Sequence, residues 1–100
     1  MTERAAMSED DSSARSPRIE IEKDRHTAYL AYDIENDGRM TLVHTVVPEA
    51  LRGHGIGGKL VEKAYAYARG RSWKVQLVCP FAVGYVAKHP ELQPFTSVKA

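Results

Sequence analysis

The residues best suited to chemistry lie between Arg52 and Lys59, where the sequence reads RGHGIGGK. Four of these eight residues are glycines, so the backbone N–H groups have few side chains to shield them. An apolar run, TLVHTVV, precedes this stretch and an amphipathic run follows it. Glycines before a helix offer converging N–H donors at the positive end of the helix dipole. We therefore predict an anion-binding loop, in which Arg52 and Lys59 add charged contacts.

Two nucleotide-binding motifs overlap this loop, and neither fits the surrounding sequence. Residues 53–58 match G-x-G-x-x-G, but residues 48–52 separate them from the preceding apolar run, and residues 73–79 lack the expected carboxylate. Residues 53–59 match the first part of a P-loop, G-x-x-x-x-G-K. The next residue of a P-loop carries a hydroxyl for magnesium, and here it is Leu60. We reject both motifs and expect no metal ion in the protein.

The composition sets limits on the class of protein. One hundred residues form one domain with a modest core, so we expect a surface groove rather than a deep cavity. A net charge of +1 argues against nucleic acid as a partner. The single cysteine, Cys79, cannot form an internal disulfide, which favours a reducing compartment. Because no apolar run approaches the roughly 18 residues of a membrane span, and no signal peptide is evident, we expect a cytoplasmic protein without membrane contact.

The first part of the chain differs from the rest. Residues 1–17 contain no long apolar side chain except two methionines, and they show no periodicity. Such a segment cannot offset the entropy cost of ordering. We predict a disordered N-terminal tail over 1–17, with a docking segment as the alternative, and one small domain over 18–100.

The domain begins with a pattern typical of strands. Alternating apolar and polar residues predict strands over 18–22 and 27–34, joined by a turn at 23–26. The sequence ENDG at 35–38 tolerates positive φ and predicts a second turn. A third strand over 39–47 is apolar at nearly every position, which is typical of a central strand covered on both faces.

A helix is predicted over 55–69, with Gly70 placed to end it as the C′ residue. Apolar residues at three- and four-residue steps define its inward face: Ile56, Leu60, Val61, Ala64, Tyr67 and Ala68. A buried strand is predicted over 72–79. Strand, glycine loop, helix and strand form a right-handed crossover between parallel strands.

In the last part of the chain we predict a second, shorter helix over 82–88, which ends before Pro90. Phe81, Tyr85 and Val86 are expected to face inward. We predict no regular secondary structure for residues 91–100, although Leu92 and Phe95 can dock on the sheet. The whole pattern predicts an α/β (α+β) fold with a mixed, mostly antiparallel sheet and one βαβ crossover.

The pattern Arg52-x-x-Gly55-x-Gly57 resembles the pyrophosphate loop of the GCN5-related N-acetyltransferases. Members of that superfamily typically present a strand, a short proline-containing link, R/Q-x-x-G-x-G/A and a helix, and all four parts occur here in order. The segments VPEALRGHGIGGKL, AYAR and LVCPFAVGYVAKHPEL look like those of the small, single-domain YjdJ-like subgroup. The resemblance covers residues 43–90 and implies a minimal acyl-CoA N-acyltransferase fold.

The resemblance implies an N-acetyltransferase that uses acetyl-CoA and an amine acceptor, which is a small molecule or a protein. In that superfamily the acyl-CoA lies in a V between two parallel strands. Carried over to this chain, the residues for pantetheine are Thr45, Val46 and Val47. The residues for the pyrophosphate are Arg52, Gly53, His54, Gly55, Ile56, Gly57, Gly58 and Lys59.

Three side chains are candidates for the chemistry of acetyl transfer. A lysine-like amine has a pKa of about 10.4, so a base must remove its proton, and an acid can protonate the leaving thiolate. His44 is the candidate base or, alternatively, an imidazole packed between strands. Tyr85 is the candidate acid, because many relatives use a tyrosine on that helix. Cys79 is either an acyl-accepting nucleophile or a small buried side chain.

A second class of function fits the same residues. A binding module that retains the CoA site but has no turnover also explains the loop, because the sequence shows no unambiguous base and no acceptor-binding helices. We expect a monomer or a weak homodimer, in which the exposed edge at 19–22 pairs with a second copy.

Overall fold

The computed structural model of the protein describes residues 17–97. The tail predicted over 1–17 therefore lies outside the described residues except for Pro17. The carbonyl of Pro17 accepts the backbone N–H of Tyr32 at 3.0 Å. Pro17 is therefore tied by one backbone hydrogen bond to the residues that form the sheet.

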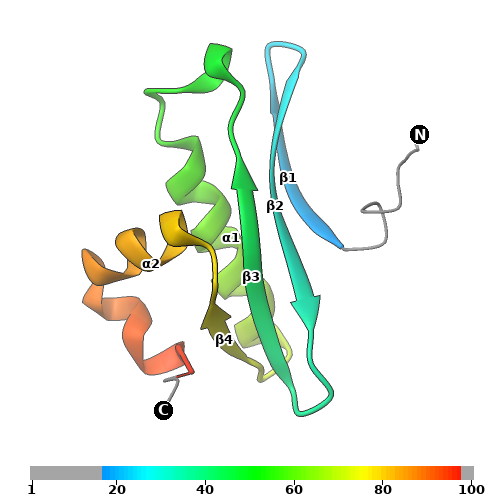
Figure 1. Cartoon of the computed structure of the whole chain (residues 1–100), viewed down its shortest axis with the longest axis vertical. Helices are drawn as coiled ribbons and strands as arrows, with labels where there is room; N and C mark the ends of the chain where they lie inside the picture. The colour runs from blue at the N-terminus through cyan, green and yellow to red at the C-terminus, as the bar shows by residue number, and fades with distance from the viewer. Residues whose placement is uncertain (1–16, 98–100) are drawn as a thin grey trace.

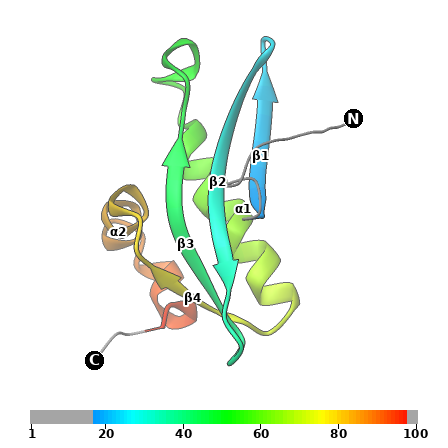
Figure 2. The ribbon, with the colours of Figure 1, turned by 45° about the vertical axis from the view of Figure 1, so that its right-hand side comes forward.

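Four strands form one mixed sheet in the order β1-β2-β3-β4, in which only β3 and β4 are parallel. The strands and helices, in chain order, are β1 (Arg18–Lys23), β2 (His26–Ile34), β3 (Arg39–Val46), α1 (Ile56–Gly70), β4 (Lys74–Leu77) and α2 (Pro80–Ala87). Two 3₁₀ segments are η2 (Glu49–Leu51) and η3 (Pro90–Phe95). In Figures 1 and 2, α1 lies across one face of the sheet, and α2 lies at the β4 edge, opposite β1. This arrangement confirms the predicted mixed sheet and its βαβ crossover.

The two predicted turns are confirmed, and both rely on positive φ. Lys23 pairs with His26, so Asp24 and Arg25 alone form the first turn, with φ of 52° and 68°. Gly38, with φ of 83°, closes the second. These turns set β1, β2 and β3 in antiparallel register.

A β-bulge in β3 shapes the sheet near the end of the strand. Ala31 pairs with His44 and Tyr32 pairs with Leu42, so Val43 is an extra residue without a partner on β2. Pairing with β4 ends at Leu42, whose carbonyl accepts the N–H groups of Val78 and Cys79 at 3.0 and 2.9 Å. Beyond Leu42, β3 continues to Val46 while the chain after β4 turns away into α2. We call this point, where β3 and β4 part at Leu42, the strand fork.

The strand fork corrects one prediction about β3. Met40, Thr41 and Leu42 are buried, as expected for a covered central strand, but Val43 and His44 are exposed. The second half of β3 lacks cover because β4 has already turned away from it. The strand predicted as buried over 72–79 is shorter, at Lys74–Leu77, and within it only Val75 is fully buried. Val78, which was expected to be buried, is 55% exposed.

The buried face of α1 follows the predicted pattern except at two tyrosines. Tyr65 is 1% exposed and Tyr67 is 37% exposed, the reverse of the expected order. The phenol of Tyr65 reaches Thr96 Oγ1 at 2.6 Å, so burial leaves it with a hydrogen-bond partner. Tyr67 instead packs its ring against Tyr32 and Trp73 at the margin of the core.

The ends of the helices also differ from the predictions. Gly70 is the last residue of α1, and the positive φ of 61° falls on Ser72 instead. The second helix begins at Pro80 rather than at 82, because proline is well suited to the first turn. Phe81, expected to face inward, is 46% exposed.

The C-terminal residues, predicted to be irregular, form η3. Leu92 is buried and Phe95 packs against the core, so the expected docking of both side chains is confirmed. Thr96 then forms an isolated parallel bridge with Val75 of β4. This segment supplies the partner of Tyr65, which the sequence pattern alone did not show.

Between residues 17 and 97, neither helix has the length and the apolar character needed to cross a bilayer.

Candidate acyl-CoA groove

An open groove of about 360 Å³ lies between the end of β3 and the beginning of α1. It is the region where β3 leads through η2 into α1, at the end of the sheet shown uppermost in Figure 1. The groove is lined by Thr45, Val47, Leu51, Arg52, Gly53, Gly55, Ile56, Gly57, Gly58 and Phe81. The structure therefore gathers eight of the predicted cofactor residues around one cavity.

Two glycines of the loop are required by backbone conformation. Gly53 has φ of 85° and Gly55, the N-cap of α1, has φ of 73°. A Cβ at either position would meet no atom within 4 Å, so space is not the constraint. An L-residue in this left-handed region is strained by roughly 1–2 kcal/mol. Leu51, only 1% exposed, anchors the same loop in the core.

The beginning of α1 presents N–H groups to the groove. No side chain caps the helix and its first turn carries no acidic residue. The carbonyl of Gly55 accepts the N–H of Lys59 at 3.1 Å, which is the first bond of the helix. The N–H groups of Ile56, Gly57 and Gly58 thus have no acceptor within the helix, and all three residues line the groove. This end of the dipole favours an anion.

The side chain of Arg52 is held beside the groove by the residue that directly follows β3. Its Nε donates a hydrogen bond to the carbonyl of Val47 at 3.1 Å. The guanidinium carries further N–H donors that can meet a phosphate oxygen. Three other predicted cofactor residues do not line the cavity: Val46, His54 and Lys59.

The structure brings Thr45 and Cys79 together across the strand fork. Thr45 Oγ1 and Cys79 Sγ are 3.2 Å apart, and either atom can donate. Cys79 is 3% exposed and is the N-cap residue of α2. A hydroxyl and a thiol therefore lie between the two parted strands, next to the lining of the groove.

His44 and Tyr85 are not placed with this pair. Successive side chains of a strand point to opposite faces, so His44 lies on the other face from Thr45. Its ring is 6.2 Å from that of Tyr29, on the exposed side of the sheet. The hydroxyl of Tyr85 donates to Glu62 Oε2 at 2.6 Å. Burial, and then the Glu62 carboxylate, raise the pKa of Tyr85 to about 12, so its proton is firmly held.

Sequence reasoning missed a contact surface that we call the α1/α2 seam, formed by Gly57, Gly58 and Glu62 of α1 and by Phe81, Tyr85 and His89 of α2 and its C-terminal extension. A Cβ on Gly57 would lie 2.7 Å from the Phe81 ring, and a Cβ on Gly58 would lie 2.6 Å from the Tyr85 ring. These two glycines therefore make room for aromatic side chains. The four-residue spacing of Phe81 and Tyr85 on one helix, after a glycine pair on another, was the available signal.

The family model described as GCN5-related N-acetyl-transferase matches residues 18–95, which include the sheet, the groove and the α1/α2 seam. The chain belongs to the GCN5-related N-acetyltransferase family. The chain is also 29% identical to Protein NATD1 of Xenopus tropicalis over 82 residues, which are 82% of this chain and 75% of that protein. Neither match separates the YjdJ-like subgroup from other GCN5-related N-acetyltransferases, so that finer placement stays a prediction.

Proposed function

We propose that the protein is an acetyl-CoA-dependent N-acetyltransferase that transfers an acetyl group to an amine. The observation that carries this proposal is the groove itself, which joins the parted end of β3 to the uncapped beginning of α1. A CoA thioester contains an anionic diphosphate and, between the diphosphate and the thioester, a pantetheine arm with two amides. The two sides of the groove offer donors of the matching kinds.

The diphosphate belongs at the loop side of the groove. Backbone N–H groups from Gly53 to Gly58 and the guanidinium of Arg52 are the proposed donors, with His54 and Lys59 adding charge or contacts from the exposed rim. A hydrogen bond to a charged group contributes on the order of 1.5–3 kcal/mol. A few such bonds support micromolar affinity after the costs of association.

The pantetheine arm belongs along the end of β3. Thr45 and Val46 pair with Leu30 and Tyr29 of β2 along one edge of the strand. Within residues 17–97, β4 pairs with the other edge of β3 only as far as Leu42. An amide of the arm can therefore extend the sheet by pairing with backbone groups of residues 45–47.

The thioester then lies near the strand fork, where Thr45 and Cys79 meet. In direct transfer, the amine nitrogen bonds to the acetyl carbon, the carbon–sulfur bond breaks, and the CoA thiolate accepts the proton lost by the amine. In transfer through Cys79, its thiolate first takes the acetyl group and releases CoA, and the amine then attacks the acetyl-cysteine. His44 can accept the proton of the amine only through intervening water, because it does not lie at the fork. Tyr85 also lies away from the fork, and its raised pKa makes it a weak acid for the leaving thiolate.

A CoA-binding module without turnover is the second candidate, and it is favoured by the distance of His44 and Tyr85 from the Thr45–Cys79 pair. Mixing the full chain with acetyl-CoA and a panel of primary amines, with thiol release as the signal, separates the two functions. We expect acetylated amine and free CoA in equal amounts. Calorimetric binding of acetyl-CoA without any thiol release assigns the protein to the binding module, and no binding contradicts both.

The role of Cys79 is tested in the same assay with Cys79→Ala. If Cys79 accepts the acetyl group, mass spectrometry of the wild type without amine finds an acetyl adduct on it and the variant loses turnover. If the variant retains full turnover, Cys79 has a packing role and transfer is direct.

A further inference from the structure

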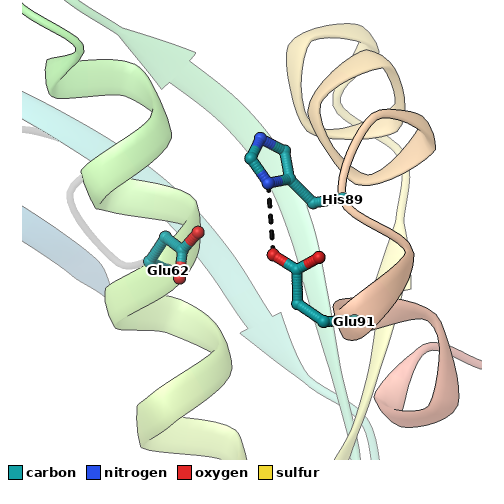
Figure 3. Close-up of side chains that lie close together, drawn as sticks. All are labelled: Glu62, His89 and Glu91. Atoms are coloured by element: carbon teal, nitrogen blue, oxygen red, sulfur yellow. Dashed lines mark hydrogen bonds and ion pairs between the residues drawn. The ribbon is translucent and has the colours of Figure 1, made fainter.

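Three potential metal ligands converge at the α1/α2 seam, and none of them lines the groove: Glu62, His89 and Glu91. One donor atom of each side chain lies within 4.8 Å of the other two. Figure 3 shows Glu62 reaching from α1 toward His89 and Glu91, which flank the beginning of η3. His89 Nδ1 and Glu91 Oε2 are 3.2 Å apart. Imidazole nitrogen and carboxylate oxygen are both ligands that zinc accepts in proteins.

A single neighbouring residue orients two of these three ligands. The His89 ring stacks on the Tyr85 ring, with centroids 4.0 Å apart and an interplanar angle of 18°. The hydroxyl of Tyr85 donates to Glu62 Oε2 at 2.6 Å. Outer partners of this kind fix the orientation of metal ligands and increase metal affinity. The imidazole and the Glu62 carboxylate are therefore kept near each other before any ion binds, and only small side-chain rotations are needed to coordinate one.

The charges around the cluster favour a cation. Among the ion pairs of the described residues, Glu91 pairs only with His89 and Glu62 has no basic partner. Two carboxylates with one half-buried imidazole leave net negative charge at neutral pH, which a divalent ion offsets.

We propose that Glu62, His89 and Glu91 form a zinc site that links α1 to the segment following α2. Zinc binds imidazole nitrogen and carboxylate oxygen at about 2.0–2.2 Å, and water completes a tetrahedral set. Ligands at these lengths are about 3.3 Å from one another, a spacing that side-chain rotation can reach because both glutamates are exposed. The ion stabilises the α1/α2 seam and takes no part in acetyl transfer.

The test uses the full chain with zinc chloride and without CoA. We expect one equivalent of zinc to bind with micromolar affinity and to raise the midpoint of thermal unfolding, and EDTA to reverse the rise. His89→Ala and Glu91→Gln each weaken zinc binding by roughly tenfold or more. His26→Ala is the matched control, since this exposed histidine lies in the β1–β2 hairpin, and it binds zinc as the wild type does.

Three results overturn the site: no zinc binding by the wild type, unchanged binding by Glu91→Gln, or loss of binding only in Cys79→Ser, which would place the ion on the thiol. Glu91→Gln keeps the shape of an exposed side chain, so a folded variant is expected even if His89→Ala loses the stacked ring. The outcome does not depend on acetyl transfer, because neither CoA nor an amine is present.

Discussion

The glycines of the loop and the glycines of the α1/α2 seam are close together in the sequence. Glycine is needed at the two sets of positions for different physical reasons. Gly53 and Gly55 adopt positive φ in open space. Gly57 and Gly58 lie in a helix and leave room for the rings of Phe81 and Tyr85. One run of glycine-rich sequence therefore does two things: it shapes an anion-binding loop and it allows two helices to pack closely.

The largest expected effect is at the seam. Gly58→Ala places a Cβ against the Tyr85 ring, which is held by its bond to Glu62 and by its stack on His89. We expect overpacking to lower the free energy of unfolding by about 1–3 kcal/mol. In a Tyr85→Ala background the same substitution raises it by up to about 1 kcal/mol, because alanine is better than glycine inside a helix.

Urea unfolding of the four proteins in this double-mutant cycle measures the coupling. Gly70→Ala is the control, since a Cβ there meets no atom within 4 Å at the other end of α1. A stabilising effect of Gly58→Ala in both backgrounds would contradict the packing role.

Substitution of a loop glycine is expected to change the free energy of unfolding less, and for a different physical reason. Gly55→Ala forces an L-residue into φ of 73°, at a cost of about 1–2 kcal/mol of unfolding free energy. Gly55→Asn costs less, because asparagine tolerates this conformation better. The cost of Gly55→Ala is expected to be the same with or without Tyr85→Ala, and strong coupling between the two in urea unfolding would show that the loop and the seam are one unit.

The smallest effect concerns the pH dependence of stability. The pKa of Tyr85 is about 12 in the folded protein against an ordinary value of 10.0, so folding favours the neutral phenol. Its contribution is complete below pH 10 and is lost as the pH rises toward 12. The difference in unfolding free energy between wild type and Tyr85→Phe is therefore constant up to pH 10 and falls above it. If this difference in unfolding free energy stays constant to pH 12, Tyr85 does not keep its proton more strongly in the folded protein than in the unfolded chain.

The order of strands and helices was predictable because local patterns determine it. Alternation defined β1 and β2, residues suited to positive φ marked the second turn, and three- and four-residue steps defined most of α1. The burial of Tyr65 rather than Tyr67 depends on a hydrogen bond to Thr96, 31 residues away. No local pattern reports such a contact, and the same holds for η3.

The groove was predictable only in part. Motif spacing singled out the residues of the loop, since their glycines and Arg52 are contiguous in sequence. The strand fork depends on the bulge at Val43 and on two N–H groups that share the carbonyl of Leu42, neither of which is visible in composition. His44 follows this bulge and is exposed, which its position in an apolar run did not indicate. The wall formed by Phe81 depends on the seam.

The most direct test of the account is a titration of the ¹⁵N-labelled protein with CoA, followed through the backbone amide resonances. If the diphosphate is held by main-chain donors at the beginning of α1, the largest shifts fall on residues 53–59, with a second set on residues 45–47. Saturable binding of CoA that leaves the amides of residues 53–59 unmoved would contradict the central claim.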